Sequence, residues 1–126
     1  MIATSPKTVL VTDDQPHIAE VIRLSLERTG CRVEIATSGE EALRKADADR
    51  IDLLIIDIGM PAMNGFETVR LLRRKPGYAA LPVIILTGSG DAQLRTAADQ
   101  FGVAAFLTKP FSPTELQRRV QKILNP

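Results

Sequence analysis

Tryptophan is missing from this sequence, and cysteine, histidine and tyrosine each occur once in 126 residues. A single cysteine excludes an internal disulfide framework and favours a reducing compartment. The apolar runs are short, so no segment approaches the roughly 20 residues of a membrane-spanning helix. Residues Met1 to Pro6 lack the basic region and apolar stretch of a secretory signal. We therefore expect a cytoplasmic protein that does not associate with a membrane.

An excess of charge of either sign is also missing. The 16 Lys and Arg residues nearly balance the 15 Asp and Glu residues, which gives a net charge of +1. Proteins that bind nucleic acid directly usually carry a strongly basic surface, so we expect no direct nucleic-acid binding. Hydrophobic residues make up 44% of the chain, enough for one core, and the length predicts a single domain over residues 1–126.

Apolar and amphipathic segments alternate along the whole chain, without a repeat or a linker. The apolar segments are predicted strands: Thr8–Thr12, Arg32–Ala36, Leu53–Asp57, Val83–Thr87 and Ala104–Thr108. The amphipathic segments are predicted helices: Gln15–Thr29, Ser38–Ala48, Phe66–Arg74, Asp91–Gly102 and Ser112–Leu124. Asp14 and Asp91 are candidate N-caps, and Ser38 with Glu41 and Ser112 with Glu115 have the spacing of capping boxes.

This alternation predicts an α/β fold of the (βα)5 type. The third and fourth strands are solidly apolar, as strands buried on both faces of a parallel sheet are. Right-handed crossovers then give a doubly wound, five-stranded parallel sheet, for which we expect the flavodoxin-like strand order 2-1-3-4-5. In that order the first and third strands are neighbours. Open α/β sheets bind ligands at the carboxyl edge beside such a reversal of strand order.

Polar residues follow four of these strands and would meet at that edge. Asp13 and Asp14 follow the first strand, Asp57 ends the third, Thr87 ends the fourth and Lys109 follows the fifth. Carboxylate oxygens are ligands that Mg²⁺ prefers, and crowded carboxylates need a cation to offset their repulsion. Mg²⁺ and Lys109 would together also offset the charge of an incoming phosphoryl group. The Thr87 hydroxyl could hydrogen-bond a phosphoryl oxygen.

Two glycines extend this predicted anion site. Gly59 and Gly88 would leave backbone N–H groups open to the phosphoryl group. Each residue of the set also has a purely structural explanation: Asp13 and Asp14 could cap a helix, and Lys109 could be a solvated charge. Their joint occurrence at four strand ends favours a functional site over coincidence.

The chain resembles the receiver domains of two-component response regulators. The resemblance rests on four groups of residues: Asp13-Asp14; Asp57 with Met60-Pro61 and Gly65 after it; Thr87-Gly88; and Lys109-Pro110-Phe111 with Glu115-Leu116 after it. It extends from about Thr8 to Leu124, which is nearly the whole chain. It implies a phosphoacceptor signalling switch that catalyses its own phosphorylation and dephosphorylation and is not a turnover enzyme.

The resemblance also implies a role for each residue of the predicted site. Asp57 would accept a phosphoryl group from a phosphohistidine on a sensor histidine kinase or a histidine phosphotransfer protein. Asp14, Asp57 and the carbonyl oxygen of Gly59 would ligate Mg²⁺ directly, whereas Asp13 would act mainly through bound water. Lys109 would pair with Asp57 and then with the phosphoryl group.

The resemblance further implies a switch that changes the binding of a downstream protein. Thr87 would move toward the phosphoryl group, Phe106 would swing inward behind it, and the peptide bond before Pro110 would be cis. The face formed by the last two predicted helices and the last strand would shift with them. Residues 102–106 lack the paired aspartates of DNA-binding relatives that dimerise through this face, so we expect a monomer or a weak dimer.

Leu24 has two interpretations. It lies roughly 160° from the centre of the apolar stripe on the first predicted helix, at about 100° per residue. It is either a single surface leucine, which is common, or part of a docking site for a kinase, because kinases contact this helix in relatives.

Three other functions are compatible with parts of the sequence. The chain could be a receiver domain taken from a larger hybrid kinase or multidomain regulator. A flavodoxin-like electron carrier would need a hydroxyl- and glycine-rich loop after the first strand, where this chain has Asp13-Asp14-Gln15-Pro16, and aromatic residues to stack a flavin. A magnesium-dependent phosphohydrolase would need a general acid beside its nucleophile, and Asp57 is followed by Ile58 and Gly59.

Overall fold

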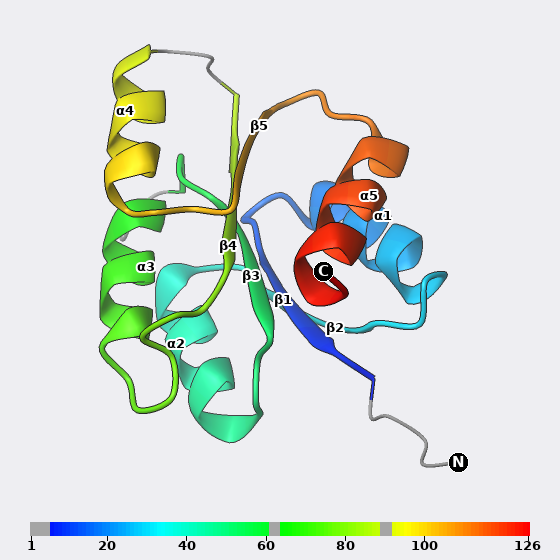
Figure 1. Cartoon of the computed structure of the whole chain (residues 1–126), viewed down its shortest axis with the longest axis horizontal. Helices are drawn as coiled ribbons and strands as arrows, with labels where there is room; N and C mark the ends of the chain where they lie inside the picture. Colours follow the sequence, from blue (N-terminus) through cyan, green and yellow to red (C-terminus); the bar gives the residue numbers. More distant parts are fainter. Residues whose placement is uncertain (1–5, 61–63, 89–91) are drawn as a thin grey trace.

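The computed structural model describes residues 6–60, 64–88 and 92–126. Five strands and five helices alternate along the chain (Figure 1). The strands are β1 (Thr8–Thr12), β2 (Arg32–Ala36), β3 (Leu53–Asp57), β4 (Val83–Thr87) and β5 (Ala105–Thr108). The helices are α1 (Pro16–Glu27), α2 (Gly39–Ala48), α3 (Gly65–Arg73), α4 (Ala92–Gln100) and α5 (Pro113–Leu124).

The strands form one parallel sheet in the order β2-β1-β3-β4-β5, which confirms the predicted topology. Helices α2, α3 and α4 cover one face of the sheet, and α1 and α5 cover the other (Figure 1). Val9 of β1 lies opposite Leu53 of β3, so the ends of these two strands are adjacent. The sheet therefore brings the segments after β1 and β3 together at its carboxyl edge.

Two hydrophobic layers hold the helices against the sheet. Side chains alternate between the faces along each strand. In β3, Leu54 and Ile56 belong to the layer under α2, α3 and α4, whereas Leu53 and Ile55 belong to the layer under α1 and α5. All five residues of β3 are buried, and the same is true of β4. The continuous apolar sequences of these strands arise from this burial on both faces.

Ser38 and Ser112 are the N-caps of α2 and α5, as the sequence predicts. The Ser38 Oγ accepts a hydrogen bond from the Glu41 N–H at 3.1 Å, and the Ser112 Oγ accepts one from the Glu115 N–H at 3.2 Å. At α3, Asn64 is the N-cap, and its side chain accepts from the Glu67 N–H. The helix consequently begins at Gly65, one residue before the predicted start.

Other element ends differ from the predictions. Asp14 is not the N-cap of α1, because Gln15 occupies that position. The Gln15 N–H donates to the carboxylate of Asp13, two residues earlier, at 2.9 Å. Helix α1 ends at Glu27, two residues early, and Gly30 with φ +91° begins the turn to β2. Strand β5 begins at Ala105, one residue late. Asp91, predicted as an N-cap, and Pro61 of the motif after Asp57 lie outside the described residues.

In the described parts of the chain, no helix combines the length and the apolar character needed to cross a membrane.

Hydrogen bonds of the Tyr78 hydroxyl connect the segment before β4 to the end of α2. This hydroxyl accepts from the Ile51 N–H at 3.0 Å and lies 3.0 Å from the Ala46 carbonyl oxygen and 3.1 Å from that of Asp49. Tyr78 is buried, so Tyr78→Phe would leave the Ile51 N–H without its partner. We expect the free energy of unfolding to fall by about 1–3 kcal/mol. Urea denaturation measures this change, and an unaltered midpoint would contradict it.

Candidate functional site

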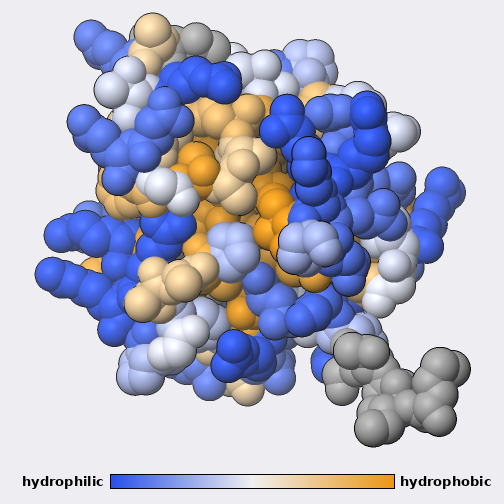
Figure 2. Space-filling model, viewed as in Figure 1, coloured by the Kyte–Doolittle hydropathy of each residue, from blue (hydrophilic) through white to orange (hydrophobic). Residues whose placement is uncertain are grey.

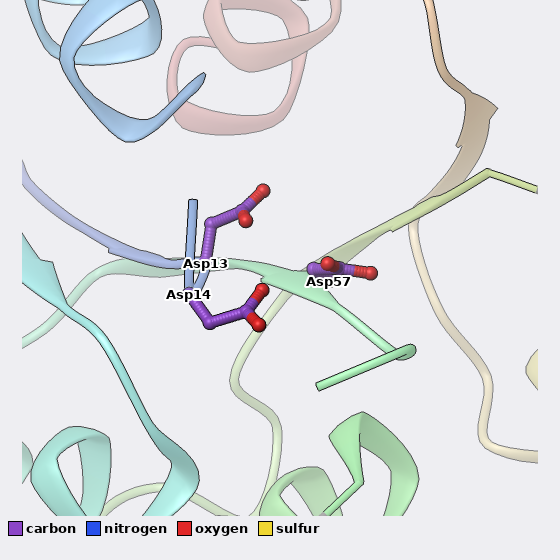
Figure 3. A group of neighbouring side chains, drawn as sticks. All are labelled: Asp13, Asp14 and Asp57. Carbon is purple, nitrogen blue, oxygen red and sulfur yellow. The ribbon is translucent and has the colours of Figure 1, made fainter. Parts of the chain in front are cut away.

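Three carboxylates meet at the carboxyl edge of the sheet. Asp13 and Asp14 follow β1 directly, and Asp57 is the last residue of β3 (Figure 3). One oxygen from each of the three lies within 4.8 Å of the others. Asp13 is fully buried, whereas Asp14 is exposed. The predicted acidic cluster is therefore assembled, with one member open to solvent.

Lys109 joins two of these carboxylates. Its Nζ lies 2.8 Å from the Asp13 Oδ2 and 3.2 Å from the Asp57 Oδ2. Only 16% of the Lys109 side chain is exposed. Burial by itself lowers the pKa of this ammonium, but the hydrogen bond and charge of Asp13, with those of Asp57, outweigh it and raise the pKa above its usual value. The lysine is therefore charged at neutral pH and partly offsets the repulsion between the carboxylates.

Each buried carboxylate has a hydrogen-bond partner for both of its oxygens. The Asp57 Oδ1 accepts from the Gly59 N–H at 2.9 Å, and its Oδ2 accepts from Lys109. The Asp13 Oδ1 accepts from the Gln15 N–H, and its Oδ2 accepts from Lys109. These contacts fix both side chains. The exposed carboxylate of Asp14 remains accessible to a ligand.

Gln15 belongs to the site but was not singled out in the sequence. Its Oε1 accepts a hydrogen bond from the Lys109 Nζ at 3.2 Å, and its side chain lines the same hollow as Asp14 and Asp57. An uncharged side chain after an acidic pair carries no recognisable signal in a single sequence. Only the folded position of Lys109 shows that the two meet.

Tight backbone packing positions the loops around the site. A Cβ on Gly65 would lie 2.6 Å from the Ile58 Cα, so only glycine lets the start of α3 approach the residue after Asp57 this closely. The Lys109–Pro110 peptide bond is cis, as expected. The Lys109 N–H donates to the Thr87 carbonyl oxygen at 2.7 Å, which joins the ends of β4 and β5.

The two predicted switch residues lie on adjacent strands. Thr87 is buried at the end of β4, directly after Leu86. Phe106 in β5 is half-buried, and the Arg95 guanidinium of α4 lies 5.4 Å from the centre of its ring. Gly59 and Gly88 line both the hollow over Asp57 and a more apolar groove that Phe66, Thr87 and Leu94 border. The acidic site is thus continuous with the neighbourhood of α4.

The residues present are suited to a hard divalent cation. Mg²⁺ binds oxygen ligands and usually keeps several waters, so a few carboxylates at an open edge are sufficient. Asp13, Asp14 and Asp57 provide these oxygens, and Lys109 balances only part of their charge. The carbonyl oxygen of Gly59, predicted as a further ligand, belongs to an exposed residue bordering the same hollow. The donor set therefore fits Mg²⁺.

Comparison with known proteins identifies the family. The family described as the response regulator receiver domain matches residues 9–121. The alkaline phosphatase synthesis transcriptional regulatory protein PhoP of Bacillus subtilis is 36% identical over 118 residues, which are 94% of this chain and 48% of that protein. The transcriptional regulatory protein ResD of the same species is 35% identical over 124 residues, which are 98% of this chain and 50% of that protein. The chain spans about half the length of these two relatives.

Solved structures agree with this result. The chemotaxis protein CheY4 of Vibrio cholerae superposes with a TM-score of 0.88 at 34% identity, covering 94% of this chain and 98% of that chain. A putative response regulator from Chloroflexus aurantiacus superposes with the same TM-score of 0.88 at 37% identity, covering 96% of this chain and 99% of that chain. Receiver domains in general bind Mg²⁺ in an acidic pocket.

The acidic cluster predicts stabilisation by Mg²⁺. A ligand that binds only the folded state stabilises it by about 1.4 kcal/mol at ten times its Kd. Asp14→Asn should lose most of this gain and should be more stable than the wild type in EDTA, because one repelling charge is gone. Asp99→Asn, an exposed change of equal charge on α4, is the control. Thermal unfolding in EDTA and in MgCl2 measures both effects, and an equal gain for all three proteins would contradict the assignment.

Proposed function

Because this chain belongs to the response regulator receiver domain family, we propose that it is a phosphorylation-controlled switch in which Asp57 accepts the phosphoryl group. The observation that carries this proposal is the pairing of Lys109 with both Asp13 and Asp57 at the sheet edge. A carboxylate nucleophile there lies beside a fixed cation and an accessible third carboxylate. That arrangement suits the transfer of a highly charged group better than the binding of an uncharged one.

The proposed donor is a phosphohistidine on a sensor histidine kinase or a histidine phosphotransfer protein. An oxygen of Asp57 attacks phosphorus, the new O–P bond forms as the N–P bond breaks, and the bonding pair returns to the imidazole nitrogen, which ends in the neutral ring after protonation. Lys109 then pairs with a phosphoryl oxygen as well as with Asp13. Asp14, Asp57 and the Gly59 carbonyl oxygen would hold Mg²⁺, with Asp13 acting through water, and the cation would supply further positive charge. The N–H groups of Gly59 and Gly88 are proposed donors to the phosphoryl oxygens.

The proposed chemistry is a single acceptance followed by self-catalysed loss of the phosphoryl group. A turnover phosphohydrolase would need a general acid beside Asp57, and the next two residues are Ile58 and Gly59. A flavin carrier would need a phosphate-binding loop after β1, where Asp13 and Asp14 would instead repel a phosphate. Both alternatives therefore fit the site less well than a phosphoacceptor does.

The proposed output is the face formed by α4, β5 and α5. Figure 2 shows apolar side chains gathered over this face, with hydrophilic ones around them. The partly buried apolar residues between positions 103 and 111 are Val103, Phe106, Leu107 and Phe111. Movement of Thr87 toward the phosphoryl group and of Phe106 inward would change this surface and its affinity for a downstream protein. We propose that the chain acts as a monomer or a weak dimer in the cytoplasm.

The proposed docking site for the phosphodonor protein lies between α1 and α5. Among the described residues, the large hydrophobic side chains that are exposed are Val21, at 47%, and Leu24, at 52%. Both border a hollow that Pro113 and Gln117 of α5 close on the other side. Exposed apolar side chains beside a pocket are typical of a protein contact.

Phosphorylation can be tested directly by intact mass. Incubation with acetyl phosphate and MgCl2 should add about 80 Da, the mass of one phosphoryl group. The adduct should require Mg²⁺ and should be missing from Asp57→Asn, which keeps the shape of the side chain without its nucleophilic charge. Lack of an adduct on the wild type, or an adduct on Asp57→Asn, would contradict the proposed acceptor.

The docking site predicts a separation between two kinds of donor. One donor is a histidine kinase that phosphorylates the wild type. Leu24→Asp should slow phosphotransfer from this kinase by about tenfold or more, because the substitution places a charge in an apolar contact. Phosphorylation by acetyl phosphate should be unchanged. Gln100→Asp, which adds the same charge at the end of α4, is the control. Equal slowing with both donors would show that Leu24→Asp disturbs the pocket and does not act through docking.

A further inference from the structure

A basic residue in the last turn of a helix is expected to interact with the carbonyl groups of that helix end. Arg73, the last residue of α3, instead bonds carbonyl oxygens of other segments. Its Nη1 donates to the Phe101 carbonyl oxygen, and its Nη2 donates to the carbonyl oxygens of Leu81 at 3.1 Å and Gly102 at 3.5 Å. Its Nε is buried without a partner among the described residues. The guanidinium is thus committed to the connections around α4 and β4.

Two of the three carbonyl groups that Arg73 contacts, those of Phe101 and Gly102, lie where α4 ends, and the third, that of Leu81, lies before β4. The Val103 N–H bonds the Ala98 carbonyl oxygen at 3.4 Å, and the Gly102 N–H bonds that of Asp99 at 3.0 Å, with Gly102 at φ +64°. This is the hydrogen-bond pattern of a Schellman motif, which leaves the next carbonyl groups pointing outward. A planar guanidinium can bond several carbonyl oxygens at once, so one side chain stabilises this whole junction.

A second contact holds the same end of α4. The rings of Phe66, in the first turn of α3, and Phe101 stack with centroids 5.1 Å apart and an interplanar angle of 29°. The Ala104 N–H then bonds the Val83 carbonyl oxygen at 2.8 Å, which leads the chain into β5. The C-terminal end of α4 is therefore attached to α3 by the hydrogen bonds of the Arg73 guanidinium and by the stacked rings of Phe66 and Phe101. The segment after it is attached to β4 by a backbone hydrogen bond.

The body of α4 is held much less firmly. Ala98 is its single fully buried residue within Ala92–Gln100, whereas α1 buries four residues and α3 buries four. Leu94 is half-buried beside the groove that reaches Thr87 and Gly88. A helix that buries a single small side chain can change its angle about a fixed end without losing much apolar burial.

We propose that Arg73 is a positioning residue that fixes the C-terminal end of α4, so that α4 responds to the acidic pocket by tilting about this end. The tilting part of this inference rests on the proposed phosphorylation of Asp57, whereas the anchoring part does not. The first turns of α4 then undergo the larger surface change, and the junction of α4 with β5 stays nearly stationary.

The anchor can be tested in the unmodified protein by amide hydrogen exchange. Arg73→Met keeps an unbranched apolar stem but removes every donor. Exchange at residues 101–104, whose amides are hydrogen-bonded, should accelerate by at least about tenfold, while the amides of β1 and β3 stay within about twofold. Arg70→Met is the matched control, because Arg70 lies one turn earlier on α3 and pairs with the exposed Glu67. Unaltered exchange at 101–104 in Arg73→Met would overturn the anchor.

Arg73→Lys distinguishes positioning from general loss of stability. An ammonium provides donors at one point and cannot span all three carbonyl oxygens, so exchange at 101–104 should be intermediate between wild type and Arg73→Met. If Arg73→Met does not fold, Arg73→Lys compared with Arg70→Lys carries the test. Global acceleration across all elements in Arg73→Lys would show a stability effect and would overturn the local role.

The tilt is tested by adding beryllium fluoride and Mg²⁺ as a phosphoryl mimic. In the wild type, exchange at 92–96 should change while 101–104 keep their protection. In Arg73→Met both segments should change, with binding of the mimic unaltered. Loss of protection at 101–104 in the wild type would overturn the pivot. If the mimic does not bind the wild type at all, the proposed function and the tilt both fail, and the anchor is judged by the unmodified protein alone.

Discussion

The rest of the site depends on the contact of Lys109 with Asp13 and Asp57. This ammonium follows β5, whereas the carboxylates belong to the ends of β1 and β3, so three strand ends are joined by one charge. Without it, two buried carboxylates would face each other with no compensation, which is a costly arrangement in a medium of low polarity. With it, the cluster still carries excess negative charge. The pocket is therefore stable enough to fold yet remains able to bind a cation.

The order of the strands determines which charges can meet. Because β1 lies between β2 and β3, the segments after β1 and β3 leave the sheet as neighbours, and Asp57 comes to lie beside Asp13 and Asp14. Lys109 follows β5, two places from β3 and three from β1, and it reaches Asp57 and Asp13 because it has a long side chain and a backbone N–H bonded to the Thr87 carbonyl oxygen. The same hydrogen bond joins the strand ends that carry Thr87 and Lys109. A change in charge at Asp57 would thus act on strand ends that are already joined by a hydrogen bond.

Most of this arrangement could be predicted from the sequence because strand ends are marked by a change from apolar to polar residues. The boundaries of β1 to β4, the strand order, the acidic cluster and the cis bond before Pro110 were correct. The prediction that Asp14 is the N-cap of α1 was wrong. Two adjacent aspartates give the same local signal, and only the fold shows that the Asp13 carboxylate accepts the Gln15 N–H at the start of the helix.

The residues that the sequence could not reveal make contacts between distant segments through ordinary side chains. Gln15, Tyr78 and Arg73 have no local pattern that distinguishes them from a surface glutamine, a core aromatic residue or a helix-terminal base. Their partners lie 94, 27 and 28 residues away. Periodicity and capping rules describe interactions within one element, so such contacts become visible only when the elements are placed together.

The C-terminal end of α4 is held by contacts that the structure describes, and this bears on the proposed signalling. The acidic site borders the groove beside Leu94, near the start of the helix, whereas Arg73 and the Phe66–Phe101 ring pair hold its other end. A force applied to a rigid helix away from its fixed end produces rotation about that end. Rotation displaces the surface most where α4 is furthest from Arg73, and it also moves Arg95, whose guanidinium lies over the Phe106 ring. A local change of charge can in this way alter both the helix and the half-buried aromatic residue of β5 without unfolding either.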